Sequence, residues 1–393
     1  MKILTFTTLF PNSEKPGHGI FVETRLRHLV ASGRVESRVL APVPWFPSTN
    51  PRFGNWARFA KAPRQEVRHG IAVAHPRYPV VPKIGMNLAP ALLAQAAKPA
   101  IARLIDEGFD FDLIDAHYFY PDGVAAAMLG RYFNKPLVIT ARGSDITLFP
   151  QYALPRKMIT WAAKRADAVI TVCNALRDEV VALGVEADRV VSLRNGVDLN
   201  LFRPTARTPN AMFTLLAVGH LVPVKAQDLM IGALSLLPDV RLVLAGDGPE
   251  REKLDNLARE LKVADRVTFL GAVPQAQLRE HYGAADALVL SSSREGWANV
   301  LLESMACGTP VVASRVYGTP EVVASPEAGV LMGERSYQGV ADAVNALRAN
   351  YPDRGATRRY AERFSWDDTT DGQLRLFDSV LMRRAGMPAL ART

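Results

Sequence analysis

Two glutamates, Glu295 and Glu303, lie in a segment whose residue types suit a ligand that carries both hydroxyls and phosphates. They flank a glycine-containing turn and an apolar run that we expect to be helical from about Asn299. Carboxylates accept hydrogen bonds from hydroxyls, such as those of a ribose and a hexose. The free amides at the first turn of a helix favour an anionic group. A nucleotide-sugar carries both kinds of group.

The elements that must position these glutamates are a strand and a helix. An apolar run at residues 287–290 has the composition of a buried strand, and polar serines follow it at 291–293. Strand, polar turn and helix in this order place ligands at the carboxyl edge of an open α/β sheet. The alternative is that both glutamates are solvated surface residues, which is common for Glu.

The whole segment 293–310 resembles the Glu-x7-Glu signature of family 4 glycosyltransferases, which adopt the GT-B fold. The usual pattern is Glu-Gly-aromatic followed by Leu-Glu-Ala-Met-Ala-x-Gly-x-Pro-Val-Val, and Ser304 replaces its Ala. The resemblance implies that Glu303 binds the ribose hydroxyls and Glu295 the hexose. It also implies that three neighbours line the nucleotide-sugar site: Gly296, Asn299 and Val300.

The start of the second half of the chain, residues 218–226, resembles the Gly-Arg-Leu…Lys-Gly diphosphate site of the same family. Gly219 allows close approach of the backbone to a ligand, and Lys225 supplies a positive charge for phosphate. This sequence departs from the pattern at His220, where Arg is usual, and at Ala226, where Gly is usual. The resemblance places Gly219, His220 and Lys225 in the nucleotide-sugar site.

Three further loops carry weaker signals. Gly246 lies in a tight turn after a strand and matches a Gly-Asp-Gly-Pro element of the family. Val273 lies in a region whose backbone meets the nucleobase in relatives. In the first half, Gly17 and Gly19 follow the first predicted strand and form a candidate amide-lined loop. This loop lacks the dinucleotide fingerprint Gly-x-Gly-x-x-Gly, so it gives no support to a dehydrogenase.

Two residues at predicted strand ends in the first half are candidate catalytic residues. His117 corresponds to a family histidine that lies near the transferred sugar in relatives. Arg142 stands where the family usually has His, as in some relatives of the exopolysaccharide and teichuronic acid type. We hypothesise that Arg142 supplies the positive charge that His220 does not, so that His117, Arg142, Lys225 and Glu295 form the catalytic set.

Short apolar strands alternate with helical patterns along most of the chain, which is typical of doubly wound parallel sheets. We therefore predict an α/β protein with two Rossmann-like domains facing an inter-domain cleft. Residues 1–198 form the predicted N-terminal, acceptor-side domain, and residues 199–374 form the nucleotide-sugar domain. The resemblance implies that a C-terminal helix, at about residues 375–393, crosses back to the N-terminal domain.

The charge is uneven along the 393-residue chain. Residues 1–205 hold 26 Lys/Arg and 17 Asp/Glu, a net +9, whereas residues 206–393 hold 21 and 22, a net −1. The segment 45–69 adds aromatic residues to several basic ones, which predicts either binding to an anionic membrane surface or a solvated loop. No nucleic-acid-binding motif is present, so nucleic acid is not an expected partner.

Composition also suggests the compartment. The two cysteines, Cys173 and Cys307, lie in apolar runs and are expected to be buried free thiols, as in a reducing cytoplasm. We found no uninterrupted apolar run of about 18 residues and expect no membrane span. The predicted location is the cytoplasm, with peripheral binding to the inner face of the membrane as its extension.

The resemblance implies a retaining transferase that moves a hexose-type sugar from a nucleotide-sugar, with UDP favoured, to a glycan or lipid-linked acceptor. No cofactor and no metal are expected. A competing signal, Asp110-Phe111-Asp112, resembles the Asp-x-Asp metal site of the other large glycosyltransferase fold. Two other functions stay open: an epimerase or phosphorylase on the same fold, and a non-catalytic nucleotide-binding module.

Overall fold

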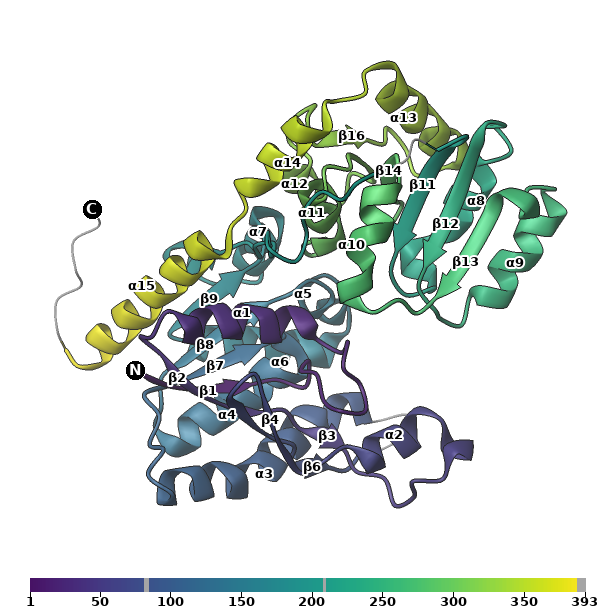
Figure 1. Ribbon diagram of the computed structural model, residues 1–393. Helices are drawn as coiled ribbons and strands as arrows, with labels where there is room; N and C mark the ends of the chain where they lie inside the picture. Colours follow the sequence, from purple (N-terminus) through teal and green to yellow (C-terminus); the bar gives the residue numbers. More distant parts are fainter. Residues whose placement is uncertain (81–84, 208–209, 387–393) are drawn as a thin grey trace. The chain divides into compact units, whose positions relative to one another are not determined.

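The computed structural model describes residues 1–80, 85–207 and 210–386. The chain divides into two compact units (Figure 1). Unit 1 comprises Met1–Arg194 together with Asp367 to the C-terminus, and unit 2 comprises Asn195–Trp366. The first division lies four residues before the boundary predicted at 198/199, and the chain returns to unit 1 earlier than the predicted residue 375. Residues 387–393 of the predicted returning segment lie outside the described residues.

Unit 1 contains a sheet in the order β10-β9-β8-β7-β1-β2-β5-β4, parallel except for the β4–β5 pair. Its strands are β1 (Lys2–Phe6), β2 (Glu36–Leu40), β4 (Gln65–Arg68), β5 (Ile71–Ala74), β7 (Leu113–His117), β8 (Leu137–Ala141), β9 (Ala168–Thr171) and β10 (Val190–Ser192). A separate parallel pair joins β3 (Val43–Pro44) to β6 (Arg77–Tyr78).

The helices of unit 1 are α1 (Ile20–Ala31), α2 (Asn55–Lys61), α3 (Gly85–Asp106), α4 (Val124–Phe133), α5 (Ser144–Thr147), α6 (Ala153–Arg165), α7 (Asn174–Ala182) and α15 (Trp366–Arg384). Short turns of helix are η1 (Pro51–Phe53), η2 (Phe119–Gly123), η3 (Phe149–Gln151) and η4 (Ala187–Arg189). From α15, Leu374, Phe377 and Val380 are buried in the same core as α1 and the sheet. The last helix is thus part of the core of the first unit, because burying its apolar face removes that surface from water.

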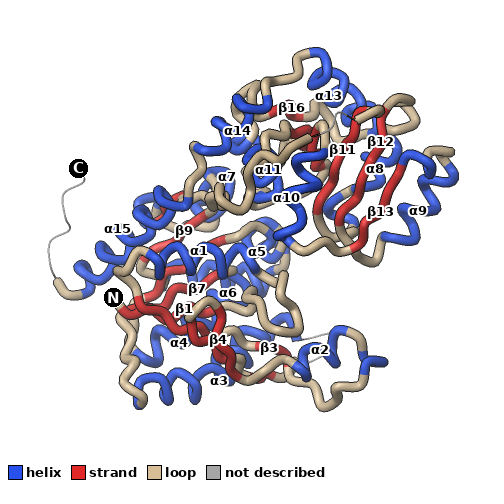
Figure 2. Tube along the Cα trace, viewed as in Figure 1, coloured by secondary structure: helices blue, strands red, loops and turns tan. Residues whose placement is uncertain are grey.

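Unit 2 contains an all-parallel sheet in the order β13-β12-β11-β14-β15-β16, with helices packed on it (Figure 2). Its strands are β11 (Phe213–Val218), β12 (Val240–Ala245), β13 (Val267–Gly271), β14 (Ala287–Leu290), β15 (Val311–Ala313) and β16 (Gly329–Leu331). Its helices are α8 (Gln227–Ala233), α9 (Arg251–Glu260), α10 (Gln275–Ala284), α11 (Asn299–Ala306), α12 (Thr319–Val322), α13 (Tyr337–Ala349) and α14 (Arg354–Glu362), with turns η5 (Pro223–Lys225) and η6 (Ala264–Arg266).

Each sheet reverses its strand order beside its first strand: β1 lies between β7 and β2, and β11 lies between β12 and β14. Loops that leave such a reversal point diverge, which opens a crevice at the carboxyl ends of the strands. In unit 2 the two diverging loops follow β11 and β14, and they carry Lys225 and Glu295. In unit 1 they follow β1 and β7, and β7 ends at His117.

One helix meets the length and composition of a membrane span, although no uninterrupted apolar run was found in the sequence. The helix α3 (Gly85–Asp106) has an 18-residue window of mean hydropathy 1.2, of which 28% is buried. A core helix of a globular protein can meet the same criteria. Leu93, Ala97 and Ile101 of α3 are fully buried within unit 1.

Candidate active site

The diverging loops of unit 2 carry two charged residues of the predicted site, Lys225 and Glu295, and these two side chains form an ion pair. Lys225 Nζ donates to Glu295 Oε1 at 2.5 Å, and the side chains are 26% and 11% exposed. The contact joins η5, after β11, to the loop after β14. A diphosphate and a hydroxyl-bearing sugar are the ligands for which a Lys–Glu pair supplies both a cation and an acceptor.

Backbone and hydroxyl contacts hold these two loops together beneath the ion pair. Ser291 Oγ donates to the carbonyl of Ala226 at 2.6 Å, and Ser293 N donates to the carbonyl of Val224 at 2.8 Å. Ala226, where the family usually has Gly, adopts the left-handed conformation with φ 49°. That conformation costs an alanine roughly 1 kcal/mol, and the contacts of this loop hold it in place.

Of the two predicted glycines in this turn, only Gly246 is required by close packing. A Cβ on Gly246 would lie 1.9 Å from the carbonyl oxygen of Gly219. A larger residue at position 246 would therefore prevent the two backbone segments from packing this closely. Beside Gly219 the nearest atom to such a Cβ is Lys225 Cε, at 3.7 Å. His220 is exposed, and its Nδ1 lies 3.2 Å from the carbonyl of Asp247. Close backbone packing therefore accounts for Gly246 without a ligand.

Glu303 is buried in unit 2 and is held by two side chains that the sequence did not indicate. Tyr282 Oη donates to Glu303 Oε2 at 2.7 Å, and Gln275 Nε2 donates to Oε1 at 3.3 Å. Burial raises the pKa of Glu303, and both hydrogen bonds oppose that rise. Each carboxylate oxygen has a second lone pair, so the group can still accept from ligand hydroxyls.

The remaining predicted residues of unit 2 lie on α11 or in the turns before α10 and α11. Helix α11 begins at Asn299, as predicted, and contains Val300 and Glu303. Asn299 Oδ1 accepts from Asn195 Nδ2 at 3.2 Å. Val273 lies in the turn between β13 and α10, and Gly296 lies in the loop before α11.

In unit 1 the two candidate catalytic residues touch. Arg142 donates from a guanidinium nitrogen to His117 Nδ1 at 2.7 Å, and His117 Nε2 lies 3.3 Å from Asp115 Oδ2. The contact arises because β7 and β8 run side by side with His117 opposite Thr140. Burial lowers the pKa of His117, Asp115 acts in the opposite direction, and Arg142 adds to the lowering. The imidazole is therefore neutral at pH 7.

Asp145 fixes the backbone on which Arg142 stands. Its carboxylate accepts from the amides of Arg142 at 3.0 Å, Gly143 at 2.6 Å and Phe119 at 2.7 Å. Burial raises the pKa of Asp145 and these amides lower it. Burial also lowers the pKa of Arg142 to about 9, with Arg25 adding to the effect, so the guanidinium remains charged at pH 7.

The glycine loop of unit 1 forms the N-terminus of α1. Gly19 has φ 69° and precedes the helix, and a Cβ there would lie 2.3 Å from the backbone of Leu9. Gly17 is exposed with open space around it, and His18 Nε2 lies 3.1 Å from the carbonyl of Thr8. Steric demand accounts for Gly19, whereas Gly17 has no packing reason to be glycine.

Asp122, which the sequence did not single out, lies beside this loop. Its Oδ2 accepts from Thr8 N at 2.6 Å and from Thr7 Oγ1 at 3.2 Å, at the end of β1. Burial raises the pKa of Asp122 to about 7 against these hydrogen bonds. A buried acid after an apolar strand and before a helix was the available signal, but one Asp in such a position is common.

Both aspartates of the Asp-x-Asp pair have protein partners in unit 1. Asp112 Oδ2 accepts from the amide of Lys2 at 2.7 Å, and Asp110 pairs with Lys135 at 2.5 Å. Both precede β7 and so lie at the end of the sheet opposite to His117. Among residues 1–80, 85–207 and 210–386, no three His, Cys, Asp or Glu side chains are grouped to hold a metal ion.

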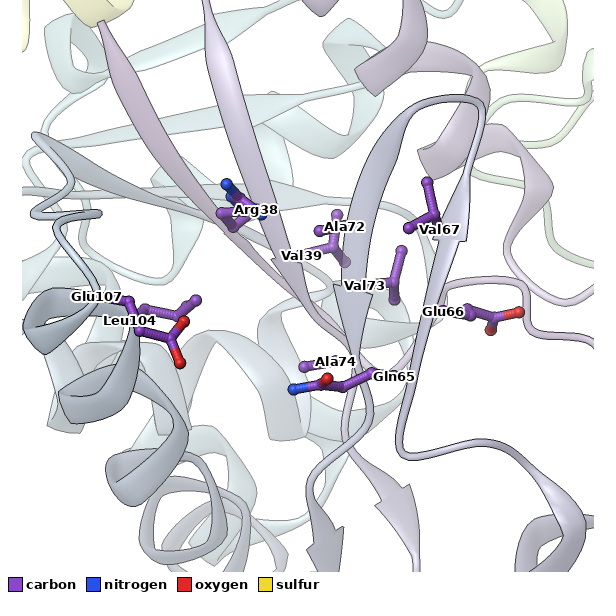
Figure 3. Close-up of a pocket in the computed structure, with 10 residues that line it drawn as sticks. All are labelled: Arg38, Val39, Gln65, Glu66, Val67, Ala72, Val73, Ala74, Leu104 and Glu107. Carbon is purple, nitrogen blue, oxygen red and sulfur yellow. The ribbon is translucent and has the colours of Figure 1, made fainter.

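A groove of about 350 Å³ in unit 1 lies away from all of these residues (Figure 3). It is lined by strands β2, β5 and β4 and by the last turn of α3, with Arg38, Glu66 and Glu107 as its charged residues. No predicted site residue lines it, so it has no part in the candidate active site.

Comparison with known proteins supports one family for both units. Residues 17–201 match the family described as glycosyltransferase family 4, and residues 202–364 match glycosyl transferases group 1. A Bacillus subtilis protein named as a teichuronic acid biosynthesis glycosyltransferase, TuaC, is 29% identical over 358 residues, which cover 88% of each chain. The D-inositol 3-phosphate glycosyltransferase of Mycobacteroides abscessus is 32% identical over 313 residues, 73% of this chain and 70% of that protein.

Solved structures agree on the fold. Sucrose-phosphate synthase from Thermosynechococcus elongatus has a TM-score of 0.81 at 21% identity, covering 97% of this chain and 99% of that one. The Anabaena protein HepE in complex with UDP-glucose has a TM-score of 0.69 at 21% identity, covering 98% and 100%. The predicted α/β architecture with two Rossmann-like domains of the GT-B type is thereby confirmed. The chain belongs to the family 4 glycosyltransferases, and it is a glycosyltransferase.

Proposed function

We propose that this glycosyltransferase takes a hexose-type sugar from a nucleotide-sugar, with UDP as the favoured nucleotide, and transfers it to a glycan or lipid-linked acceptor. The observation that carries the proposal is the Lys225–Glu295 pair in the diverging loops of unit 2. Lys225 binds the diphosphate, Glu295 binds a sugar hydroxyl, and Glu303 binds the ribose. The relative named for teichuronic acid biosynthesis and the fold neighbour solved with UDP-glucose support this substrate class.

The proposed reaction retains the configuration of the sugar and uses no metal. The bond from the sugar anomeric carbon to the phosphate oxygen breaks, and the acceptor oxygen bonds to that carbon on the same face. The leaving diphosphate takes the proton of the acceptor hydroxyl. Lys225 stabilises the negative charge that develops on the leaving oxygen, and Arg142 adds a second cation. Closing the site against water limits hydrolysis of the donor.

The test begins with calorimetric titration of UDP, GDP and ADP, followed by their sugars, into the full-length protein. We expect binding of UDP with the highest affinity. NMR of the product formed from the donor that binds should then show the same anomeric configuration as the donor, with unchanged turnover in EDTA. Product that forms without any acceptor would instead indicate an epimerase, and absence of nucleotide binding would reject the proposal.

Arg142 is proposed to offset the charge that His220 does not provide. The single variants Arg142→Gln and His220→Ala each remove one donor, and the double variant removes both. A loss in kcat/KM that departs from additivity by more than about 0.5 kcal/mol would support a shared role on the diphosphate. Additive losses would reject it.

We also propose that unit 1 binds an anionic membrane surface through residues 45–69, whose exposed tryptophans, Trp45 and Trp56, we call the aromatic patch. These side chains are 55% and 41% exposed. Phe46 packs on Trp56, with ring centroids 5.7 Å apart, so this part of the segment is folded rather than a loose loop. Exposed apolar side chains beside basic ones suit the interface of an anionic bilayer.

The charge around the aromatic patch is positive. Residues 45–65 contain four basic side chains and no acidic one, namely Arg52, Arg58, Lys61 and Arg64. Arg68, at the end of the predicted segment, instead pairs with Glu23 at 2.6 Å. Each basic residue near an anionic surface contributes about 1 kcal/mol, and salt weakens the attraction.

Co-sedimentation with vesicles tests the patch. Pelleting should require phosphatidylglycerol, fade at high salt and drop in the variant Trp45→Ser/Trp56→Ser/Lys61→Glu. The matched control is Lys253→Glu, an exposed charge reversal on α9 of unit 2, which should pellet as wild type. Equal pelleting of the patch variant and wild type would show that these residues are only a solvated surface.

A further inference from the structure

Gln373, on the helix that returns to unit 1, is buried within the polar residues at the strand ends. It is 1% exposed and lies on α15 beside the apolar residues that anchor that helix in the core. Its Oε1 accepts from Arg25 Nε at 2.9 Å, and its Nε2 donates to Asp115 Oδ2 at 3.0 Å. The amide therefore joins α1, β7 and α15 through one side chain.

The oxygen that Gln373 contacts is the same one that faces His117. Asp115 Oδ2 lies 3.0 Å from Gln373 Nε2 and 3.3 Å from His117 Nε2. On its other side His117 Nδ1 contacts Arg142 at 2.7 Å. A guanidinium can only donate, so Nδ1 must accept and the ring proton must be on Nε2, pointing to Asp115. The chain of contacts fixes one neutral tautomer of His117.

The same hydrogen bonds also link two buried charged side chains, Arg25 and Asp115, through the amide of Gln373. Arg25 is fully buried and donates to Gln373 and, at 3.2 Å, to the carbonyl of Leu193. Burial lowers the pKa of Arg25 to about 10, and Asp115 opposes that effect, so Arg25 stays charged. Unpaired buried charges are costly, so Arg25 and Asp115 require the polar amide between them. An apolar residue at position 373 would leave both with one partner fewer.

We propose that Gln373 is a positioning residue of the transferase. By donating to Asp115 and accepting from Arg25, it holds the carboxylate where Oδ2 faces His117 Nε2, and so selects the tautomer that carries its proton on Nε2. Because that tautomer presents Nδ1 to Arg142, Gln373 also sets the orientation of the guanidinium. The consequence for catalysis rests on the proposed function, since it assumes that Arg142 acts on the leaving diphosphate.

The test compares Gln373→Met, which keeps the volume but removes both hydrogen bonds, with the wild type by NMR of isotope-labelled histidine. The chain has seven histidines, and the spectrum of a His117→Asn variant identifies the signals of His117. Wild type should show the neutral Nε2–H tautomer at neutral pH. In Gln373→Met, Asp115 loses a competing donor and stabilises the imidazolium more strongly. His117 should then titrate at a higher pH, with Asp115, Arg142 and Arg25 as the charged groups that face it.

Gln373→Glu is the second variant, because it keeps an acceptor for Arg25 while removing the donor to Asp115. Gln373→Glu should change the His117 signals in the direction expected for Gln373→Met. It therefore provides the test if Gln373→Met does not fold. Leu374→Ala is the matched control, since the neighbouring buried residue on α15 packs only in the core. It should lower stability without altering the tautomer. The turnover of Gln373→Met should fall about tenfold, as expected for loss of a hydrogen bond to a charged group, with the KM for the donor unchanged.

Two outcomes would overturn the proposal. One is a charged His117, or one with its proton on Nδ1, in the wild type at neutral pH. The other is a Gln373→Met or Gln373→Glu spectrum in which the His117 signals match the wild type, or in which Leu374→Ala reproduces the change. The histidine signals are recorded without substrate, so this result does not depend on whether the protein transfers a sugar.

Discussion

The polar residues at the strand ends of the two units differ in how completely the protein itself pairs them. In unit 1, His117 and Arg142 are 1% and 9% exposed and are linked to each other. In unit 2, Lys225 is 26% exposed and pairs with Glu295, a residue that we also propose to bind the ligand. If the proposed function holds, the groups of unit 1 are preorganised, whereas Lys225 of unit 2 exchanges its ion pair with Glu295 for the donor. Preorganised side chains lose little conformational freedom when a ligand binds. A side chain that exchanges an internal partner for the ligand can adapt to a charged ligand.

The largest expected effect is at the cation of unit 2. Lys225→Ala should lower kcat by about 100–1,000-fold, the typical cost of removing one charge-stabilising donor from an active site. Steady-state kinetics with the donor identified by calorimetry measures it. Lys253→Ala, an exposed lysine on α9 that pairs with Glu250, is the control and should retain full activity. A loss below about tenfold would mean that Arg142 of unit 1, and not Lys225, provides most of the stabilisation of the negative charge on the leaving diphosphate.

The buried carboxylate of unit 2 should have the next largest effect. Glu303→Ala removes acceptors for two ribose hydroxyls and should weaken binding of nucleoside diphosphate by about 10–100-fold, at roughly 1.5–3 kcal/mol for a charged hydrogen bond. Calorimetry with UDP measures the change. Glu280→Ala, an exposed residue on α10, is the control and should bind as wild type. If Glu303→Ala binds UDP with unchanged affinity, Glu303 does not bind the ribose.

The sequence predicted the strands better than the contacts. Apolar runs in the sequence predict eleven strands, and all of them are present within one residue at each end, because buried parallel strands are continuous apolar runs bounded by turns. The predicted ranges are 3–7, 37–41, 113–116, 137–140, 168–172, 190–193, 213–218, 241–245, 267–270, 287–290 and 311–313. The pair β4–β5 was missed because the burial along it alternates and β4 is an edge strand with mostly polar residues. The two-residue strands β3 and β6 carry too few residues for a pattern, and β16 begins with a glycine and is only half-buried.

The candidate residues at the strand ends were predicted by resemblance, whereas their partners were not. Gln373 meets Arg25 across 348 positions of sequence and Asp115 across 258. No local pattern connects such residues, since only the return of α15 to unit 1 brings them together. The contact between Tyr282 and Glu303 could not be predicted for a related reason. In the sequence, a buried tyrosine cannot be distinguished from other core aromatic residues, because the acceptor of its hydroxyl is known only from the fold.

A smaller effect is expected on the stability of unit 1. Burial raises the pKa of Asp122 to about 7, above its value in the unfolded chain, so the folded state binds the proton more tightly. The resulting stability is complete at acid pH and is lost as the pH rises to about 7. Asp122→Asn should lack this contribution to the pH dependence. Thermal unfolding at about pH 5 and pH 8 should show a fall of a few degrees in wild type that is reduced in the variant. Equal slopes would show that Asp122 is ionised throughout.

The smallest effect, on binding of diphosphate to Glu295→Ala, tests the comparison most directly. Glu295 competes with the ligand for Lys225, so its removal should leave the affinity for UDP unchanged or raise it up to about fivefold, the range of an ion pair worth 0.2–1 kcal/mol. Turnover should nevertheless fall, because the sugar hydroxyl loses its acceptor. Calorimetry with UDP and kinetics with the nucleotide-sugar separate the two quantities, and Glu334→Ala, an exposed glutamate of unit 2, controls for loss of charge. Weaker binding of UDP to Glu295→Ala would mean that Glu295 holds Lys225 in place for the phosphate. Both units would then be preorganised in the same way.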